Sequence, residues 1–237
     1  NKVTLGNITV TGNVTGGAGT TTDNNTVNIN GTTVTDKIIG GTQAMGTGNT
    51  LNVAGTNTAA NIVGFQKVAF NTSGVAAHGT MLNLTGGAQT KVDWTNLTAT
   101  GTAEKPLTLL KNESGIDLEG YTGAAKSETT DTTETNVDVR KNSLGKITAI
   151  TYEGYQFAGV TAPVISGTDV YGGISRAGNA THTNHITVNG NYTNVYGGHT
   201  SGTSTTAVEK KNSHDNTVTI TGGTLGNVYG GYTAADG

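Results

Sequence analysis

Apolar and polar residues alternate in short segments that recur along the chain. In the segment 25–31, which reads Asn-Thr-Val-Asn-Ile-Asn-Gly, Val27 and Ile29 fall on one face of an extended chain and polar side chains on the other. Alternation of this kind that ends at glycine is typical of a half-buried strand followed by a turn. Related segments that open with asparagine lie at 7–12, 49–55, 184–190 and 216–222.

A second element, Val-Tyr-Gly-Gly, follows the alternating segments in the last third of the chain. Its copies begin at Val170, Val195 and Val228, so they are 25 and 33 residues apart. Each repeat therefore predicts a strand, a turn, a second short strand such as 192–196, and another turn.

Stacking of these repeats predicts the fold. A unit of this size cannot bury its apolar face alone, so we expect each strand to pair in parallel with its counterpart in the next unit. The predicted fold class is all-β, a parallel β-helix (β-solenoid) that spans residues 1–237 as one segment, with loop or hairpin excursions of different length. An antiparallel sandwich stays open as an alternative, because frequent turn signals also suit that fold.

The range from about 104 to 153 departs from the repeat pattern. It holds nine of the sixteen acidic residues, and it includes a polar run at 127–134. The apolar segments 107–110 and 147–152 are expected to be strands on either side of an exposed segment, either a hairpin or a small subdomain. We therefore predict an irregular, acidic excursion within the β-helix.

Composition narrows the class of protein. Apolar residues make up 33% of the chain and aromatic residues 5%, which suits a thin core beneath a continuous sheet. A net charge of −3 without a stripe of lysine and arginine gives no electrostatic support for binding nucleic acid. The absence of cysteine excludes disulfides and thiolate metal sites. The sequence contains no export signal and no apolar run long enough to span a bilayer. It begins without Met and ends just after a repeat motif, so we expect a segment of a longer protein.

Candidate catalytic residues are few. A pectinase-like hydrolase would carry paired aspartates and a Gly-His-Gly segment, and the nearest match is Gly-Gly-His at 197–199. A polysaccharide lyase needs clustered carboxylates beside a basic residue, yet the sequence holds only two arginines, Arg140 and Arg176. Asp169 and Arg176 flank one Tyr-Gly-Gly copy, and we interpret them as a surface ion pair. We predict no catalytic residue and no cofactor.

Four histidines, His182, His185, His199 and His214, lie in the same region of the sequence. Zinc sites need three or four converging ligands, and no third ligand stands at a recognisable spacing from His182 and His185. We interpret all four as solvated residues in turns, and we predict no metal site.

Tyrosines supply the candidate contact surface. Tyr171, Tyr196 and Tyr229 occupy the same position in the three Val-Tyr-Gly-Gly copies, and Tyr192 and Tyr232 lie nearby in the sequence. If the first three share a corner of successive repeats, they form a stacked ladder whose exposed rings would suit contacts with sugars or protein. Stacked tyrosines beside a Gly-Gly turn also stabilise a fold without binding anything, and this structural role is the favoured interpretation.

These repeats resemble the passenger domains of bacterial type V autotransporters, in particular large surface proteins with repeated Asn-Val-Tyr-Gly-Gly units. Thr-Asn-Val-Tyr-Gly-Gly at 193–198, Gly-Asn-Val-Tyr-Gly-Gly at 226–231 and the segment 166–179 carry the likeness. The resemblance implies a right-handed parallel β-helix displayed outside the outer membrane and, for many such passengers, adhesion or self-association. The translocator barrel that defines the family is not in this sequence, and any contact with the membrane would be made through that part.

The function expected from this resemblance is that of an extracellular, surface-exposed structural and adhesive segment without catalytic activity. Its partners would be host or bacterial surface glycans or proteins, or further copies of itself, held by many weak contacts. The alternative is a glycan-processing β-helix, such as a polysaccharide lyase, a hydrolase or a tailspike, with its site in the range 104–153. A third hypothesis is a purely structural spacer.

Overall fold

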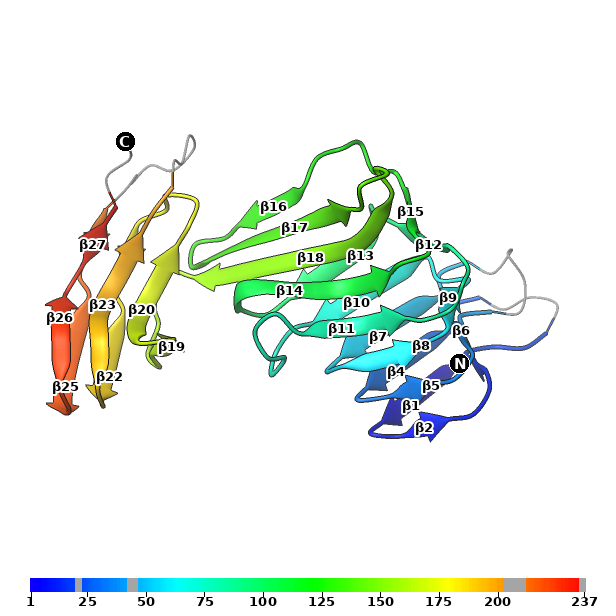
Figure 1. Cartoon of the computed structure of the whole chain (residues 1–237), viewed down its shortest axis with the longest axis horizontal. Coiled ribbons are helices and arrows are strands. Elements are labelled where there is room, and N and C mark those ends of the chain that lie inside the picture. The colour runs from blue at the N-terminus through cyan, green and yellow to red at the C-terminus, as the bar shows by residue number, and fades with distance from the viewer. Residues whose placement is uncertain (20–22, 42–46, 203–211, 235–237) are drawn as a thin grey trace. The chain divides into compact units, whose positions relative to one another are not determined.

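The computed structural model describes residues 1–19, 23–41, 47–202 and 212–234, which form 27 β-strands and no helix (Figure 1). The all-β class predicted from the alternating segments is confirmed, and many of the strands pair in parallel. Within the described ranges there is no helix that would cross a membrane. The chain divides into two compact units. The first unit is Asn1–Lys126 with Asn136–Glu153, and the second unit is Ser127–Thr135 with Gly154–Gly237.

The first fifteen strands lie in the first unit and follow one another in sets of three. They are β1 (Lys2–Gly6), β2 (Thr9–Val10), β3 (Val14–Thr15), β4 (Thr26–Asn30), β5 (Thr33–Val34), β6 (Lys37–Ile39), β7 (Thr50–Ala54), β8 (Asn57–Ala59), β9 (Asn61–Val63), β10 (Lys67–Asn71), β11 (Thr80–Leu84), β12 (Thr90–Asp93), β13 (Leu97–Thr100), β14 (Ala103–Asn112) and β15 (Ile116–Glu119). The first strands of the five sets form a parallel sheet in the order β1-β4-β7-β10-β13. The second strands follow the order β2-β5-β8-β11-β14, and the third strands form β3-β6-β9 and β12-β15.

The pairing register in the first unit follows the repeat in the sequence. Val27 on β4 lies opposite Val3 on β1 and Leu51 on β7. The partners in these first repeats are 24 residues apart, as Asn28 and Thr4 also are. Because the register is kept, apolar residues from equal places in successive repeats stack in one core. Among its fully buried side chains are Val27, Ile38, Leu51, Phe70, Leu82, Leu97 and Leu110.

A buried asparagine precedes the first strand of two successive repeats. Asn25 and Asn49 are fully buried, and Oδ1 of Asn49 accepts hydrogen bonds from the backbone N–H and from Nδ2 of Asn25, at 2.9 and 3.0 Å. The residues before them, Asn24 (φ 53°) and Gly48 (φ 73°), have the left-handed backbone that asparagine and glycine tolerate best. The asparagine that opens the alternating segments therefore links one repeat to the next.

The alternating segment at 7–12 has a different place in the repeat from the one at 25–31, so their predicted equivalence is wrong. The segment 7–12 contains β2, which pairs with β5, whereas 25–31 contains β4, which pairs with β1. Asn7 has φ 51° and occupies the turn position that Gly31 (φ 61°) takes in the next repeat. Alternation alone does not show which strand of a repeat it forms, because every half-buried strand has the same period.

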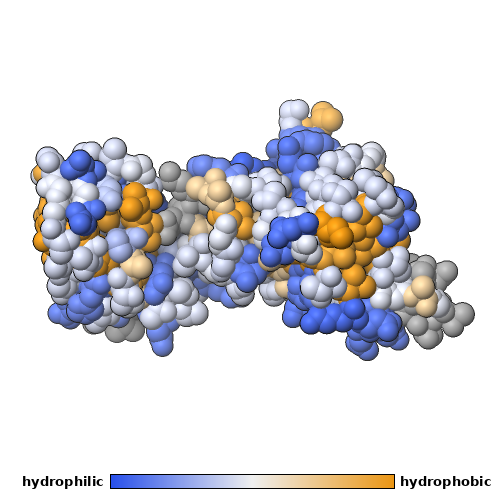
Figure 2. Space-filling model, turned by 90° about the horizontal axis from the view of Figure 1, so that it is seen from below, coloured by the Kyte–Doolittle hydropathy of each residue, from blue (hydrophilic) through white to orange (hydrophobic). Residues whose placement is uncertain are grey.

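Apolar side chains are partly uncovered at the first repeat. Figure 2, which views the molecule from below, shows apolar residues gathered on the first unit. Ile8 is 47% exposed, and Val3, Leu5 and Val10 are half-buried against the core. These side chains belong to the first repeat, and a neighbouring repeat covers them on one side only, since β1 and β2 are at the ends of their sheets.

Three strands follow the fifth set. They are β16 (Lys126–Thr129), β17 (Thr133–Lys141) and β18 (Ile147–Gln156), in the sheet order β16-β17-β18-β14. Their directions alternate in Figure 1, and hydrogen-bonded turns at 130–133 and 142–146 join them. The segments 107–110 and 147–152 are strands, as predicted, and belong to the neighbouring strands β14 and β18.

The second unit contains nine further strands. They are β19 (Val164–Ser166), β20 (Asp169–Ser175), β21 (Thr181–His182), β22 (His185–Asn189), β23 (Tyr192–Thr200), β24 (Ser213–His214), β25 (Thr217–Gly222), β26 (Leu225–Tyr229) and β27 (Tyr232–Thr233). Strands β20, β23 and β26 pair in parallel, as do β21 with β24 and β22 with β25. A small core of Val160, Val170, Ile186, Val188 and Val195 lies between them.

The asparagine link of the first unit recurs in the second unit. Nδ2 of Asn184 donates a hydrogen bond of 2.7 Å to Oδ1 of Asn216, and each asparagine directly precedes a strand of the β22–β25 pair. The residues before them, Thr183 (φ 52°) and Asp215 (φ 51°), again have a left-handed backbone. The same local device therefore aligns repeats in both units.

A buried carboxylate holds the loop that follows β20. Glu134 is 5% exposed, although the polar run 127–134 was expected to be exposed throughout. Its two oxygens accept hydrogen bonds from the Ser175 hydroxyl (2.9 Å), the backbone N–H groups of Arg176 (2.5 Å) and Ala177 (3.2 Å), and the Asn179 amide (2.6 Å). The other residues of the run up to Thr132 are exposed, as predicted.

Candidate functional site

Three tyrosines of the Val-Tyr-Gly-Gly copies lie in register on neighbouring strands of the second unit. Tyr171 on β20 pairs with Tyr196 on β23, which pairs with Tyr229 on β26. The ring centroids are 5.1 Å apart in both pairs, and the ring planes differ by 13° and 7°. We call these three residues the tyrosine column. The stacked geometry agrees with the sequence expectation, and contact with a ligand remains a prediction.

A second aromatic row lies beside the tyrosine column. His199 on β23 pairs with Tyr232 on β27, and their rings stack with centroids 5.1 Å apart. Both rings make T-shaped contacts with Tyr196, at centroid distances of 5.1 Å for His199 and 5.4 Å for Tyr232. His199 was not predicted as a member of this site, although it directly follows one Tyr-Gly-Gly copy as Tyr232 follows the next, which was a usable signal.

The interpretation of the histidines as residues in turns is wrong for all four. His182 on β21 and His214 on β24 are paired in parallel, and their rings stack at 5.4 Å, while His185 is exposed on β22. Pairing in register brings equal positions of successive repeats together, so side chains that look isolated in the sequence become neighbours. Within the described ranges no group of three His, Cys, Asp or Glu side chains is placed to hold a metal ion.

Tyr192 lies apart from the tyrosine column. It pairs with Leu225 in the sheet, and its side chain packs against the small core that contains Val170 and Val195. Among the described residues it has no ring contact with the column, so the structure brings together four of the five predicted tyrosines.

A polar row runs along the same sheet, two residues before the tyrosine column. Nδ2 of Asn194 donates to Oδ1 of Asp169 at 2.9 Å, and Nδ2 of Asn227 donates to Oδ1 of Asn194 at 3.0 Å. The expected ion pair between Asp169 and Arg176 is absent among the described residues. The Arg176 guanidinium instead lies 5.6 Å from the centroid of the Tyr155 ring.

Stacking decides which part of each ring a ligand would reach. Tyr196 has Tyr171 on one side and Tyr229 on the other, each at 5.1 Å, so both faces of its ring are covered. The column therefore presents a row of ring edges and hydroxyl groups. Tyr196, in the middle of the column, therefore offers no open ring face on which a sugar could stack.

Burial sets the protonation of the aromatic groups. Burial raises the pKa of Tyr171 and Tyr196 above the ordinary tyrosine value, and the Asp169 carboxylate raises both further. Burial lowers the pKa of His199, and the nearby Arg176 guanidinium lowers it further. At neutral pH Tyr171, Tyr196 and His199 are therefore uncharged, and the two tyrosines keep their phenol hydroxyl groups.

The lowered pKa of His199 predicts acid sensitivity of the second unit. Below about pH 6.5 His199 is protonated in the unfolded chain but stays neutral in the folded state, whose His199 pKa is lower. Proton binding therefore favours the unfolded chain, and the free energy of unfolding falls. This loss continues until the pH passes below the folded pKa. We expect denaturant midpoints measured between pH 7.5 and about 5 to fall less in His199→Gln than in the wild type. His185→Gln, at an exposed position, is the matched control, and an unchanged pH dependence in His199→Gln would contradict the prediction.

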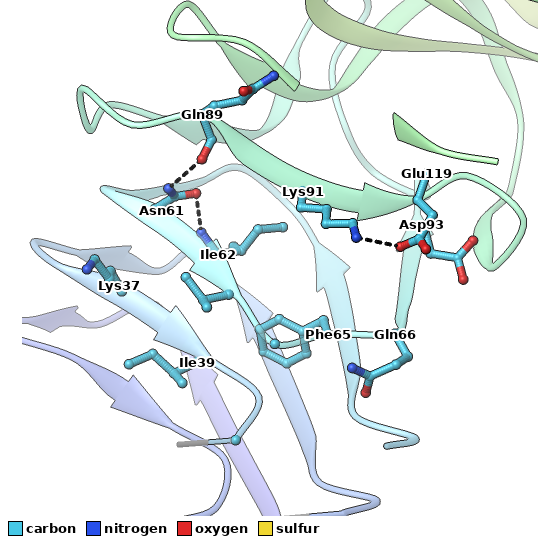
Figure 3. Close-up of a pocket in the computed structure, with 13 residues that line it drawn as sticks. Lys37, Ile39, Asn61, Ile62, Phe65, Gln66, Gln89, Lys91, Asp93 and Glu119 are labelled. Carbon is cyan, nitrogen blue, oxygen red and sulfur yellow. Dashed lines mark hydrogen bonds and ion pairs between the residues drawn. The ribbon is translucent and has the colours of Figure 1, made fainter. Parts of the chain in front are cut away.

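The first unit has a groove that was not predicted from the sequence. It has a volume of about 670 Å³ and lies over the strands β6, β9, β12 and β15 (Figure 3). Ile39, Val63 and Phe65 supply its apolar part, and Lys91 forms an ion pair of 2.9 Å with Glu119 at one side. The groove combines residues from several repeats. Its one signal in the sequence is that Ile39 and Val63 stand at equal places in successive repeats, where they pair in the sheet.

Comparison with protein-family models, with curated proteins and with solved structures finds no match to this chain. The fold and site define an all-β protein of stacked parallel strands with an aromatic row on one sheet. The likeness to autotransporter passengers depends on the repeated sequence segments alone.

Proposed function

We propose that the chain is a non-catalytic, extracellular β-helix that attaches to a partner through the tyrosine column. The first and second strands of each set pair with their counterparts in the next set, and the third strands pair within β3-β6-β9 and within β12-β15. This pattern supports the β-helix, because the chain then winds once for each set. The right-handed sense and the location at a bacterial surface follow from the resemblance to type V passengers. The proposed partners are surface glycans or proteins, or a second copy of this chain.

The alignment of Tyr171, Tyr196 and Tyr229 carries this proposal. Their ring edges repeat at 5.1 Å along the sheet, beside a row of aspartate and asparagine side chains. A surface that repeats one weak hydrogen-bonding group suits a partner that itself repeats. Once one contact has formed, the linked groups meet at a high effective concentration, so the weak contacts together bind more tightly. The half-buried rings lose little conformational freedom when a partner binds, since stacking already orders them.

The test is a glycan and extracellular-matrix binding screen on the full chain, followed by titration of any partner found. Tyr196→Phe keeps the ring stack and removes one hydroxyl, so we expect a loss of affinity of about tenfold with unchanged stability. Tyr192→Phe, on the same strand but outside the column, is the matched control. Equal affinity of Tyr196→Phe and the wild type for every partner would refute a role for the column.

A glycan-processing activity is the alternative, and the groove of the first unit is where it would act. Asp93 and Glu119 line that groove, and Glu119 lies in the acidic range 104–153. Burial acts to raise the pKa of Asp93, but hydrogen bonds from Asn96 and Thr95 outweigh it and hold the pKa below the ordinary value. A general acid needs a raised pKa, so Asp93 does not suit that role. Release of reducing ends or unsaturated products in the same wells would favour the enzyme over the adhesive segment.

A further inference from the structure

The sheet β1-β4-β7-β10-β13 carries a trough of about 380 Å³ on its outer face. Two rows of outward side chains run across the strands and form its walls. One row is Thr4, Asn28, Asn52 and Ala69, and the other is Asn30, Ala54, Asn71 and Thr100. All residues that line the trough are uncharged.

The first row contains a directed chain of hydrogen bonds with an open end. Nδ2 of Asn52 donates to Oδ1 of Asn28 at 2.7 Å, and Nδ2 of Asn28 donates to Oγ1 of Thr4 at 3.0 Å. In this row each side-chain oxygen accepts a hydrogen bond from the amide on the following strand. The row of amides ends at Asn52, so Oδ1 of Asn52 is its last acceptor. The next strand has Ala69 at this place, whose methyl group cannot donate. No donor among the described residues fills that position.

The lining of the trough indicates which kind of ligand it would bind. A trough without charge favours a neutral chain over an acidic one, because charges would lose hydration without gaining a partner. Its groups repeat at the strand spacing of about 4.8 Å, which is close to the length of one sugar in an extended β-linked polysaccharide. The methyl groups of Ala54 and Ala69 leave room for the ring of a sugar, and the amides around them suit its hydroxyl groups. A peptide strand would instead add to a sheet edge.

We propose that this trough binds a neutral, extended β-linked oligosaccharide that lies across the five strands. One sugar hydroxyl takes the place above Ala69 and donates its proton to Oδ1 of Asn52. The site belongs to the first unit alone, and it does not depend on the tyrosine column.

The experiment titrates the full chain with cellotetraose and follows side-chain amide signals by NMR. Maltotetraose, with a bent α-linked chain, and tetragalacturonate, with carboxylates, are the comparison probes. We expect cellotetraose to shift the amide signals of Asn28, Asn52 and Asn71 and to bind about tenfold or more tightly than either comparison probe.

Ala69→Asn is the decisive variant. The new amide would donate to Asn52 and extend the hydrogen-bond chain, so the fold is kept while the position of the sugar hydroxyl is filled. We expect an affinity loss of about tenfold or more with a retained thermal midpoint, and no loss in the exposed control Ala88→Asn. Asn30→Ala, at an exposed place on the opposite wall, is a second variant expected to weaken binding if Ala69→Asn does not fold.

Several results would overturn the proposal. They are no cellotetraose binding, shifts confined to residues outside the trough, equal binding of tetragalacturonate, and full affinity in both Ala69→Asn and Asn30→Ala. Tyr196 lies in the second unit, so the Tyr196→Phe substitution should leave cellotetraose binding to the trough unchanged. Failure of the tyrosine column as a binding site is therefore separable from failure of the trough.

Discussion

Replacing Glu134 with alanine is expected to lower the free energy of unfolding of the second unit by about 3 kcal/mol. The buried carboxylate accepts four hydrogen bonds, and two of the donors are backbone N–H groups of Arg176 and Ala177. The other two donors, the Ser175 hydroxyl and the Asn179 amide, are buried, so alanine leaves them without this acceptor, and each unsatisfied buried group costs about 1–3 kcal/mol. Partial relaxation of the loop after β20 recovers some of that cost.

Urea unfolding and hydrogen exchange measure this effect. The amides of Arg176 and Ala177 should exchange faster in Glu134→Ala, because their hydrogen-bond acceptor is gone. Glu128→Ala is the matched control, since Glu128 is an exposed glutamate of the same polar run, and it should change stability by no more than about 0.5 kcal/mol. Similar unfolding midpoints and exchange rates in the two variants would show that the carboxylate does not hold the loop.

Replacing Asn49 with alanine is expected to destabilise the first unit by about 2–3 kcal/mol. Oδ1 of Asn49 satisfies both the backbone N–H and the side-chain amide of the buried Asn25, and Nδ2 of Asn49 donates to the carbonyl of Gly64 at 3.2 Å. The substitution therefore leaves buried polar groups unpaired in two neighbouring repeats. It creates little empty volume, so the cost comes from lost hydrogen bonds and not from a cavity.

Tryptophan fluorescence gives a local measure of this loss. Trp94 is the only tryptophan of the chain and is buried in the core of the first unit, so its emission reports the unfolding of that unit. Asn30→Ala removes an exposed asparagine from the neighbouring β4 and should shift the urea midpoint little. An equally small shift for Asn49→Ala would mean that the asparagine link is not a source of stability.

The strands and their stacking were predictable because the signals are local and repeated. Alternation around Val27 and Ile29 requires only that one face of a strand be buried. Copies of one motif must come into register when their strands pair in parallel, and the stack of Tyr171 on Tyr196 follows from that alone. The place of a segment within a repeat was less predictable, as the segment 7–12 shows, because alternation looks the same in every half-buried strand.

The sequence by itself determined the all-β class, the half-buried strands and the alignment of the three tyrosines, since each depends on periods that a single strand or repeat carries. Only the tertiary structure decided what those groups offer to a partner. It covered the ring faces of Tyr196, turned Tyr192 to the core and buried Glu134 against a loop 41 to 45 residues further along the chain. These outcomes depend on distances between strands and on side chains from unrelated segments, which local patterns do not encode.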